Sequence, residues 1–339
     1  MKPVILSSPA PRSLELIFTP EKLAFLHSHY EVVKTTDEAL AQLPDEPLTA
    51  ARYIIGQPPI SHDTLARLQN LRAVFNVETN LTDNMPYKTV FERGIHVLTT
   101  GAVFAVPVAE LGLGLALDLA RGITDADIAF RQGGEQWGGD GNVHARLLTQ
   151  SDVGIIGYGD LGRALKKTLA GFNCRIKVYD PWLPPSVLME NGVIPADLDD
   201  VIANSDFLFV VAAVTSENLH FLGAEAFAAM RPNTRLVLLS RAEVVDFDAL
   251  MDAAQSGQIL VASDVFPMEP MPENHRARSL PNFIRSAHRA GALDVAFKQM
   301  GNMVLEDMEL MDKDLPPMRC KRAERETVSR MQSRPVAHN

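Results

Sequence analysis

The sequence feature that most constrains the fold is a glycine-rich hexapeptide, Gly157–Gly162, which reads GYGDLG. It follows the apolar run Val153–Ile156 and opens the helical pattern Leu161–Leu169. In a turn between strand and helix, the first glycine permits the tight turn, the second lets the backbone approach a pyrophosphate, and the third allows close packing. The helix N-terminus adds oriented N–H groups for the anion. The predicted cofactor-binding residues are Gly157, Gly159, Asp160, Leu161 and Gly162.

An acidic side chain follows where a dinucleotide fold needs one. Asp180 ends the next apolar run, Ile176–Tyr179, about 20 residues beyond the glycines, where a carboxylate accepts hydrogen bonds from the adenosine ribose. The same charge repels a 2′-phosphate, so the sequence favours NAD over NADP. Thr215, which follows a later apolar run, is also predicted to bind the cofactor.

Short apolar runs alternate with helical patterns along the chain, which is typical of βαβ units around parallel sheets, so the expected fold class is α/β. The first set of expected strands is Val4–Ser7, Glu31–Thr35, Arg52–Gly56, Ala73–Val77 and His96–Thr99. The second set is Val153–Ile156, Ile176–Tyr179, Phe207–Val211, Leu236–Leu239, Leu260–Ser263 and Phe283–Arg285. Other expected segments are a linking helix at Val108–Ala120, a glycine-rich loop at Gly133–Asn142 and a last helix from Gly291 to Met311.

Composition excludes several function classes. The 339 residues suggest about two domains. A net charge of −10 disfavours binding to nucleic acid. Two cysteines make no disulfide framework or CxxC metal pair. The longest apolar run, Phe207–Val214, is far shorter than the ~20 residues that span a bilayer. We therefore expect a cytoplasmic protein with a small-molecule substrate and no membrane, metal or nucleic-acid partner.

Three strings with catalytic residue types follow three successive expected strands, where open α/β sheets bind their ligands. They read LLSRAEVVD around Arg241, DVFPMEP at Asp264–Pro270 and SAHRAG at Ser286–Gly291. With Val108-Ala109-Glu110 upstream, these strings and their order resemble the D-isomer-specific 2-hydroxyacid dehydrogenases, over roughly residues 70–305.

The resemblance implies a catalytic set. Arg241 would hold the substrate carboxylate, since only an arginine offers two parallel donors to a planar anion. His288 would exchange a proton with the keto oxygen, and Glu269 would orient the imidazole and stabilise its protonated form. Asp264 matches a position beside the nicotinamide of the cofactor.

Three departures from the family pattern bear on the substrate. Ala242 replaces the glycine that follows the catalytic arginine, so the local backbone is expected to differ. The family's loop after the fourth strand typically reads AGVG, whereas residues 78–81 of this chain read ETNL. The position ahead of the VAE string, where the family usually has a small polar residue, is Phe104 here. These changes predict a 2-hydroxy or 2-keto acid with a polar or bulky tail rather than one as small as glyoxylate. The predicted substrate-binding residues are Glu78, Asn80, Leu81, Phe104, Arg241 and Arg289.

The resemblance also implies the domain layout: a Rossmann-type NAD-binding domain at residues 102–291, inserted in a flavodoxin-like substrate domain at 1–101 and 292–339. It implies a homodimer as well, and domains that close over the substrate. Two alternatives remain open. One is an NAD(H)-sensing, corepressor-like binding protein, and the other is a phosphite-type dehydrogenase, which keeps the same Arg/Glu/His set.

Overall fold

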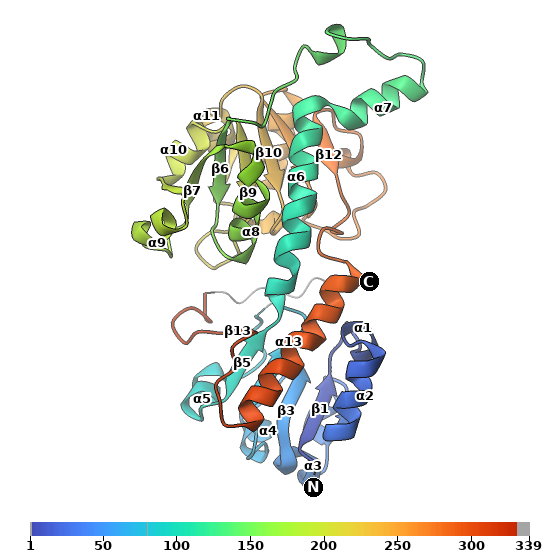
Figure 1. Cartoon of the computed structure of the whole chain (residues 1–339), viewed down its shortest axis with the longest axis vertical. Helices are drawn as coiled ribbons and strands as arrows, with labels where there is room; N and C mark the ends of the chain where they lie inside the picture. Colours follow the sequence, from blue (N-terminus) through green and yellow to red (C-terminus); the bar gives the residue numbers. More distant parts are fainter. Residues whose placement is uncertain (1, 80, 331–339) are drawn as a thin grey trace. The chain divides into compact units, whose positions relative to one another are not determined.

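The computed structural model describes residues 2–79 and 81–330 (Figure 1). The described chain divides into two compact units. Unit 1 comprises the residues up to Phe104 together with those from Ala292 onward, and unit 2 runs from Ala105 to Gly291. The chain therefore leaves unit 1, builds the whole of unit 2, and returns.

Unit 1 is a six-stranded sheet, in the order β13-β5-β4-β3-β1-β2, flanked by helices. All neighbouring strands are parallel except β13, which runs antiparallel to β5. Its strands are β1 (Val4–Ser8), β2 (Glu31–Lys34), β3 (Ala51–Gly56), β4 (Ala73–Asn76), β5 (His96–Thr99) and β13 (Lys321–Arg322). Its helices are α1 (Leu14–Ile17), α2 (Pro20–His29), α3 (Asp45–Ala50), α4 (His62–Arg67), α5 (Tyr87–Glu92) and α13 (Asp294–Asp312). Because β2 lies on one side of β1 and β3 on the other, the strand order reverses between β1 and β3.

The last long helix completes the core of unit 1. Buried methionines of α13, among them Met300 and Met308, pack against β-strand side chains such as Phe75. Close approach to α1 explains a glycine in this helix, since a Cβ at Gly301 would lie 2.3 Å from the carbonyl oxygen of Ile17. In Figure 1 the orange α13 runs beside the dark blue α1, so segments almost 300 residues apart in sequence share one core.

Unit 2 is a seven-stranded, fully parallel sheet in the order β12-β11-β10-β9-β6-β7-β8. Its strands are β6 (Asp152–Ile156), β7 (Arg175–Tyr179), β8 (Ile194–Pro195), β9 (Phe207–Val210), β10 (Thr234–Leu238), β11 (Ile259–Ser263) and β12 (Phe283–Arg285). Its helices are α6 (Ala105–Arg121), α7 (Ile123–Arg131), α8 (Asp160–Thr168), α9 (Pro185–Glu190), α10 (Leu198–Ala203), α11 (Ala224–Ala229) and α12 (Phe247–Gln255). This order is that of a Rossmann-type sheet with one added strand, which confirms the predicted α/β class.

Helix α6 is the core helix of unit 2. Together with the preceding turn it forms the segment Gly101–Arg121, which has a mean hydropathy of 1.8. By length and composition alone, this segment could span a membrane. It packs against α8 and against the sheet at β10 and β11. A Cβ at Gly112 would lie 2.5 Å from Leu239 Cδ1, so this helix lies as close to the sheet as a glycine permits. These contacts with α8 and with the sheet are those of a core helix in a globular domain.

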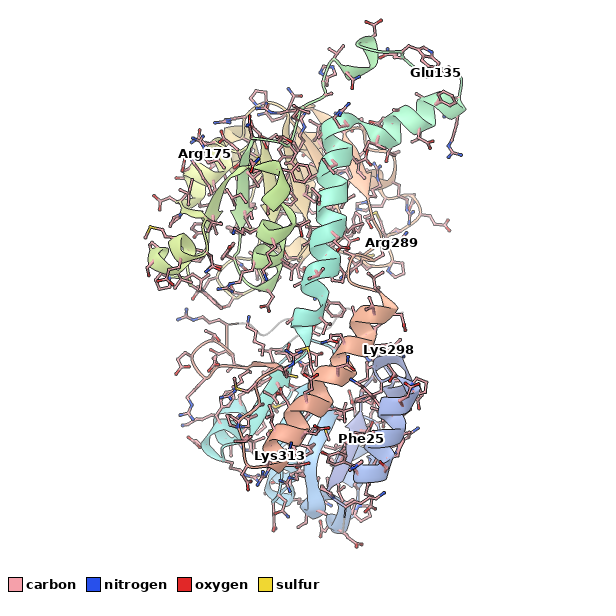
Figure 2. All side chains as sticks on the ribbon, viewed as in Figure 1. Phe25, Glu135, Arg175, Arg289, Lys298 and Lys313 are labelled. Carbon is pink, nitrogen blue, oxygen red and sulfur yellow. The ribbon has the colours of Figure 1, made fainter. Side chains whose placement is uncertain are left out.

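The segment after α6 contains a helix that the sequence pattern did not indicate. Helix α7 buries none of its side chains, and the glycine-rich segment after it contains only a short 3-10 turn at Asp140–Asn142. Figure 2 shows Glu135 where the chain leaves α7, and we call residues 122–147 the arm. Several large apolar side chains of the arm are exposed: Ile123, Ile128, Phe130, Trp137, Val143 and Leu147.

Candidate active site

The glycine-rich turn joins β6 to α8 and has the geometry of a phosphate cradle. Gly157 has a φ of +92°, and a Cβ there would lie 2.6 Å from the Cα of Ala212. A Cβ at Gly162 would lie 2.5 Å from the carbonyl oxygen of Gly157, whereas one at Gly159 would meet nothing within 4 Å. The first and third glycines are therefore required by packing, and the second leaves open the room that a pyrophosphate needs. Asp160 and Leu161 form the first turn of α8.

Asp180 lies directly beside this turn. One carboxylate oxygen accepts a hydrogen bond from the backbone N–H of Tyr158 at 2.7 Å, and the other accepts from that of Trp182 at 2.9 Å. These two bonds fix the direction of the carboxylate and leave lone pairs for further donors. The turn and Asp180 therefore fit the pyrophosphate and the adenosine ribose of a dinucleotide. Thr215 lies in the loop after β9, where its hydroxyl accepts from the N–H of Glu217 at 3.2 Å.

The structure brings the three predicted catalytic residues to one edge of the unit 2 sheet. Arg241 follows β10, Glu269 lies in the segment after β11, and His288 follows β12. These strands are neighbours in one parallel sheet, so their carboxyl ends lie side by side. His288 Nδ1 and Glu269 Oε2 are 2.5 Å apart, and the other carboxylate oxygen accepts from the N–H of Phe266 at 2.9 Å. The guanidinium of Arg241 donates to the carbonyl of Ser240 at 2.8 Å.

The electrostatics of this group favour an ionised glutamate. Burial raises the pKa of Glu269, but the hydrogen bonds from His288 and from the Phe266 N–H lower it, as do the charges of His288 and Arg241. The net result is a pKa below the ordinary value of a glutamate. A carboxylate that stays ionised can both fix the tautomer of the histidine and stabilise its protonated form.

The backbone at His288 is held in an uncommon conformation. Its φ is +47°, in the left-handed region that few residues other than glycine adopt. Asp264, which is only 1% exposed, supports it: the carbonyl of Asp264 accepts from the N–H of His288 at 2.7 Å. The two carboxylate oxygens of Asp264 accept from the N–H groups of Arg289 and Ala290, each at 3.1 Å. Sequence reasoning missed this positioning role, because no motif states which backbone groups a carboxylate will bind. The cofactor contact expected for Asp264 stays a prediction.

Ala242 stands where the family has a glycine, and the sequence therefore predicts a different local backbone. The backbone at Ala242 shows no strained conformation. It begins a 3-10 turn, has no positive φ, and places its methyl group in the hydrophobic core of unit 2. The methyl group therefore fills core space without strain.

The predicted substrate-binding residue Arg289, labelled in Figure 2, is exposed.

The other predicted residues that the structure describes, Glu78, Leu81 and Phe104, lie in unit 1, after strands β4 and β5. Glu78 follows β4 and is half-buried. Thr79 beside it has a φ of +81° and donates its N–H to the side chain of the fully buried Asn76 at 2.7 Å. The loop thus keeps the left-handed turn that a glycine would allow. Leu81 packs into the core of unit 1, so only its backbone is available to a ligand, and Asn80 lies outside the described residues.

Phe104 is half-buried and packs edge-to-face on Phe297 of α13, with ring centroids 6.3 Å apart.

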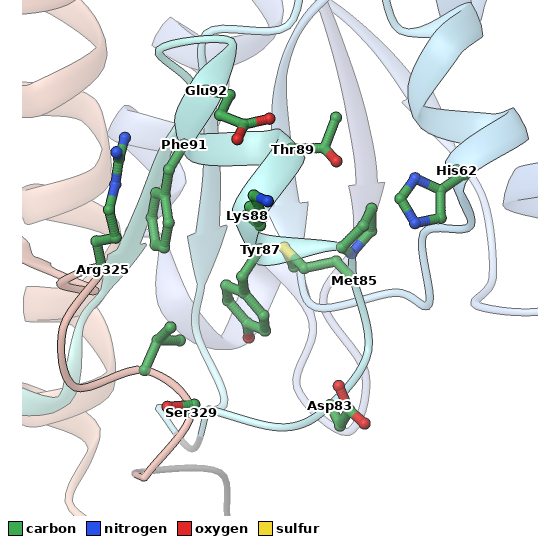
Figure 3. A pocket seen from close by; sticks show the side chains of 12 residues that line it. His62, Asp83, Met85, Tyr87, Lys88, Thr89, Phe91, Glu92, Arg325 and Ser329 are labelled. Carbon is green, nitrogen blue, oxygen red and sulfur yellow. The ribbon is translucent and has the colours of Figure 1, made fainter.

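A separate cavity of about 660 Å³ opens on unit 1 beside α5 (Figure 3). Its lining includes Lys88, Phe91 and Arg325 and none of the predicted site residues. Within residues 2–79 and 81–330, no cluster of His, Cys, Asp and Glu side chains could hold a metal ion.

Comparison with known proteins gives the same family as the motifs. Residues 113–290 match the family model of the D-isomer specific 2-hydroxyacid dehydrogenase, NAD binding domain. The chain is 64% identical to a phosphoglycerate oxidoreductase from Rhizobium etli of known structure, with a TM-score of 0.89 and coverage of 96% of this chain and 100% of that one.

Curated relatives are more distant. A hydroxypyruvate reductase of Thermotoga maritima is 28% identical over 295 residues, which is 86% of this chain and 92% of the relative. A D-3-phosphoglycerate dehydrogenase of Methanocaldococcus jannaschii is 27% identical over 277 residues, 81% of this chain but only 51% of the relative, so the chain spans about half the length of that protein. With the glycine cradle and the Arg/Glu/His group in place, the chain belongs to the D-isomer specific 2-hydroxyacid dehydrogenases, a family of oxidoreductases.

Proposed function

We propose that this chain transfers a hydride between the nicotinamide of NAD and C2 of a 2-hydroxy or 2-keto acid. The observation that carries the proposal is the 2.5 Å contact between His288 and Glu269 on the same sheet edge as Arg241. When bound, the reduced nicotinamide supplies the hydride. Gly157, Gly159, Gly162, Asp160, Leu161 and Thr215 would hold the cofactor, with Asp180 on its ribose and Asp264 near the nicotinamide.

His288 is the proposed acid–base group. Its Nδ1 faces Glu269, and its Nε2 has no hydrogen-bond partner within residues 2–79 and 81–330, so Nε2 can face a substrate. In reduction, Nε2 gives its proton to the keto oxygen while C2 receives the hydride, and the negative charge of Glu269 stabilises the protonated imidazole beforehand. In oxidation the same nitrogen takes the hydroxyl proton back, so one residue serves both directions.

Arg241 is the proposed anchor for the substrate carboxylate. A guanidinium presents parallel N–H donors that match a carboxylate, and this fixes the direction from which C2 is approached. Glu78, Asn80, Leu81, Phe104 and Arg289 are proposed to take part in substrate binding.

The overall proposal is tested by NADH oxidation across glyoxylate, pyruvate and hydroxypyruvate, with phosphite and NAD⁺ as a separate reaction. Turnover of at least one keto acid is expected. Turnover of phosphite alone would replace the proposal by a phosphite-type activity, and NADH binding without any turnover would favour a cofactor-sensing protein.

NAD is the proposed cofactor because Asp180 occupies the ribose position. We expect Asp180→Asn to weaken NADH binding by about 1.5–3 kcal/mol, the value of a hydrogen bond to a charged group, which is roughly ten- to hundredfold in Kd. Activity with NADPH should rise at the same time, because the repelling charge is gone while an acceptor oxygen remains for the Tyr158 amide. Fluorescence titration with both cofactors measures this. Asp199→Asn, on the exposed face of α10, is the matched control. A variant that still prefers NADH as strongly as the unchanged protein would contradict the assignment.

A homodimer is the proposed assembly, and the arm is the proposed contact. Its exposed Phe130 and Trp137 pack edge-to-face on each other with centroids 6.5 Å apart. Contiguous apolar surface of this kind marks an interaction site. Light scattering should give twice the chain mass, and Trp137→Asp should shift the population to monomer. Met318→Asp, which alters an equally exposed apolar residue of unit 1, should not. An unchanged mass for Trp137→Asp would remove the arm from the interface.

We also place the protein in the cytoplasm, which its two unpaired cysteines support.

A further inference from the structure

The carboxyl edge of the unit 2 sheet carries an exposed tryptophan that the sequence motifs do not mark. Trp182 lies two residues after Asp180, in the loop that follows β7. Its backbone N–H donates to one carboxylate oxygen of Asp180 at 2.9 Å, and the other oxygen accepts from the N–H of Tyr158 in the glycine-rich turn at 2.7 Å. The backbone of Trp182 is therefore fixed against the same carboxylate that fits the adenosine ribose.

The strand order of unit 2 places the ligand crevice beside this loop. In open α/β sheets, ligands bind outside the carboxyl ends of the strands, at the point where the strand order reverses. Strand β6 has β7 on one side and β9 on the other, so the order reverses at β6. The loops after β7 and β9 therefore flank the crevice, the first with Trp182 and the second with Ala212 and Ala213. A bulky aromatic residue thus belongs to the loop at the ribose position, and small residues belong to the other loop.

The indole of Trp182 has surface available for stacking. The residue is 38% exposed, although it is one of the largest apolar residues of the chain. Within residues 2–79 and 81–330, it stacks on no other aromatic ring and on no cation. Pro181 and Pro184 restrict the loop backbone around it, so little conformational entropy is lost when a ligand packs there.

We propose that Trp182 stacks on the adenine ring of the dinucleotide and anchors the adenosine half of the cofactor. Adenine is the planar group attached to the ribose that Asp180 fits, and a base presents a π-face to an aromatic side chain. The inference rests on the proposed function for the identity of the cofactor, and it adds a binding residue to that site. Because this anchor does not involve the nicotinamide, free adenine nucleotides such as AMP should compete with NADH.

Tryptophan fluorescence tests the contact directly, because Trp137 and Trp182 are the only tryptophans of the chain. Trp137→Phe, in the arm, leaves Trp182 as the only source of the emission. AMP does not absorb at the wavelengths of tryptophan emission, so saturable quenching by AMP requires contact with the ring. We expect such quenching, with a Kd that also describes the competition of AMP with NADH. Ribose 5-phosphate, which lacks the base, should not quench.

Substitutions at Trp182 measure how much the ring contributes. Trp182→Leu should weaken the binding of AMP and of NADH by about five- to 150-fold in Kd, the range for stacking of one base on an aromatic side chain. Trp182→Phe should recover most of the loss, since it keeps a ring. Phe130→Leu, which also removes an exposed aromatic ring of unit 2, is the matched control and should change neither Kd.

The preference between NADH and NADPH separates stacking from an effect on Asp180. It should be the same in Trp182→Leu as in the unchanged protein, because the 2′-phosphate is on the ribose and the backbone N–H that holds Asp180 remains. A changed preference would mean that the variant acts through Asp180 and not through the base.

The remaining outcomes distinguish this inference from the proposed function. If NADH binds but AMP neither quenches Trp182 nor competes, or if Trp182→Leu keeps both Kd values, the stacking is wrong and the dehydrogenase proposal stands. If the unchanged protein binds neither NADH nor AMP, the proposed function itself fails. The quenching is measured with Trp182 in place, so this result does not depend on how well Trp182→Leu folds.

Discussion

Replacing His288 by asparagine is expected to lower kcat for keto-acid reduction by about 10²–10⁴-fold, the usual contribution of a positioned acid–base group. Asparagine is the informative choice because the φ of +47° at this position is tolerated by asparagine better than by most residues. The loop and its bonds to Asp264 should therefore persist. The amide cannot exchange a proton near neutral pH, so only the chemical step is removed.

Binding measurements separate this effect from damage to the fold. The Kd for NADH of the His288→Asn variant should stay within about twofold of the unchanged protein, because the glycine cradle and Asp180 are elsewhere on the sheet edge. His27→Asn, on the exposed end of α2, exchanges residues of similar helix propensity and serves as the control. Turnover by His288→Asn within tenfold of the unchanged protein would mean that another group supplies the proton.

The sequence predicts that Arg241, Glu269 and His288 lie at one edge of the sheet for a simple physical reason. Arg241, Glu269 and His288 each follow a buried parallel strand, and the carboxyl ends of such strands meet at one edge. The order of the motifs therefore specifies the neighbourhood of the side chains, although they are nearly 50 residues apart in the chain. The glycine-rich turn is predictable in the same way, because its spacing reflects local packing needs at Gly157 and Gly162.

Other features depend on contacts that no local pattern encodes. The role of Asp264 rests on two backbone N–H groups about 25 residues away, and the side chain of Arg12 donates to the carbonyl of Val77 only because β1 and β4 flank β3. Helix α7 has no buried side chain, so it lacks the apolar periodicity by which a helix is identified. The strands β8 and β13 have two residues each, too short for any alternation to show. Sequence patterns therefore do not predict hydrogen bonds between a side chain and the backbone of a distant segment.

Replacing Arg241 by glutamine is expected to cost about 2–5 kcal/mol of transition-state stabilisation, the range for truncating one partner of a hydrogen-bonded charge pair, which is roughly 30- to 5000-fold in kcat/KM. The loss follows because the substrate carboxylate would lose its charged donors and its fixed orientation. Arg241→Lys should recover part of the loss, since it restores the charge but not the two parallel donors. Steady-state kinetics with one keto acid measure both variants, with Arg325→Lys as the control.

The two Arg241 variants also differ in how activity depends on pH, because the charge of Arg241 helps to lower the pKa of Glu269. In Arg241→Gln that pKa rises toward its ordinary value, so Glu269 becomes protonated at a higher pH and support for the protonated histidine is lost earlier on acidification. The acid limb of the kcat profile should therefore move to higher pH in Arg241→Gln and remain in place in Arg241→Lys. If both variants lose activity equally and neither moves the acid limb, Arg241 acts only on the shape of the loop, and the substrate carboxylate must be bound elsewhere.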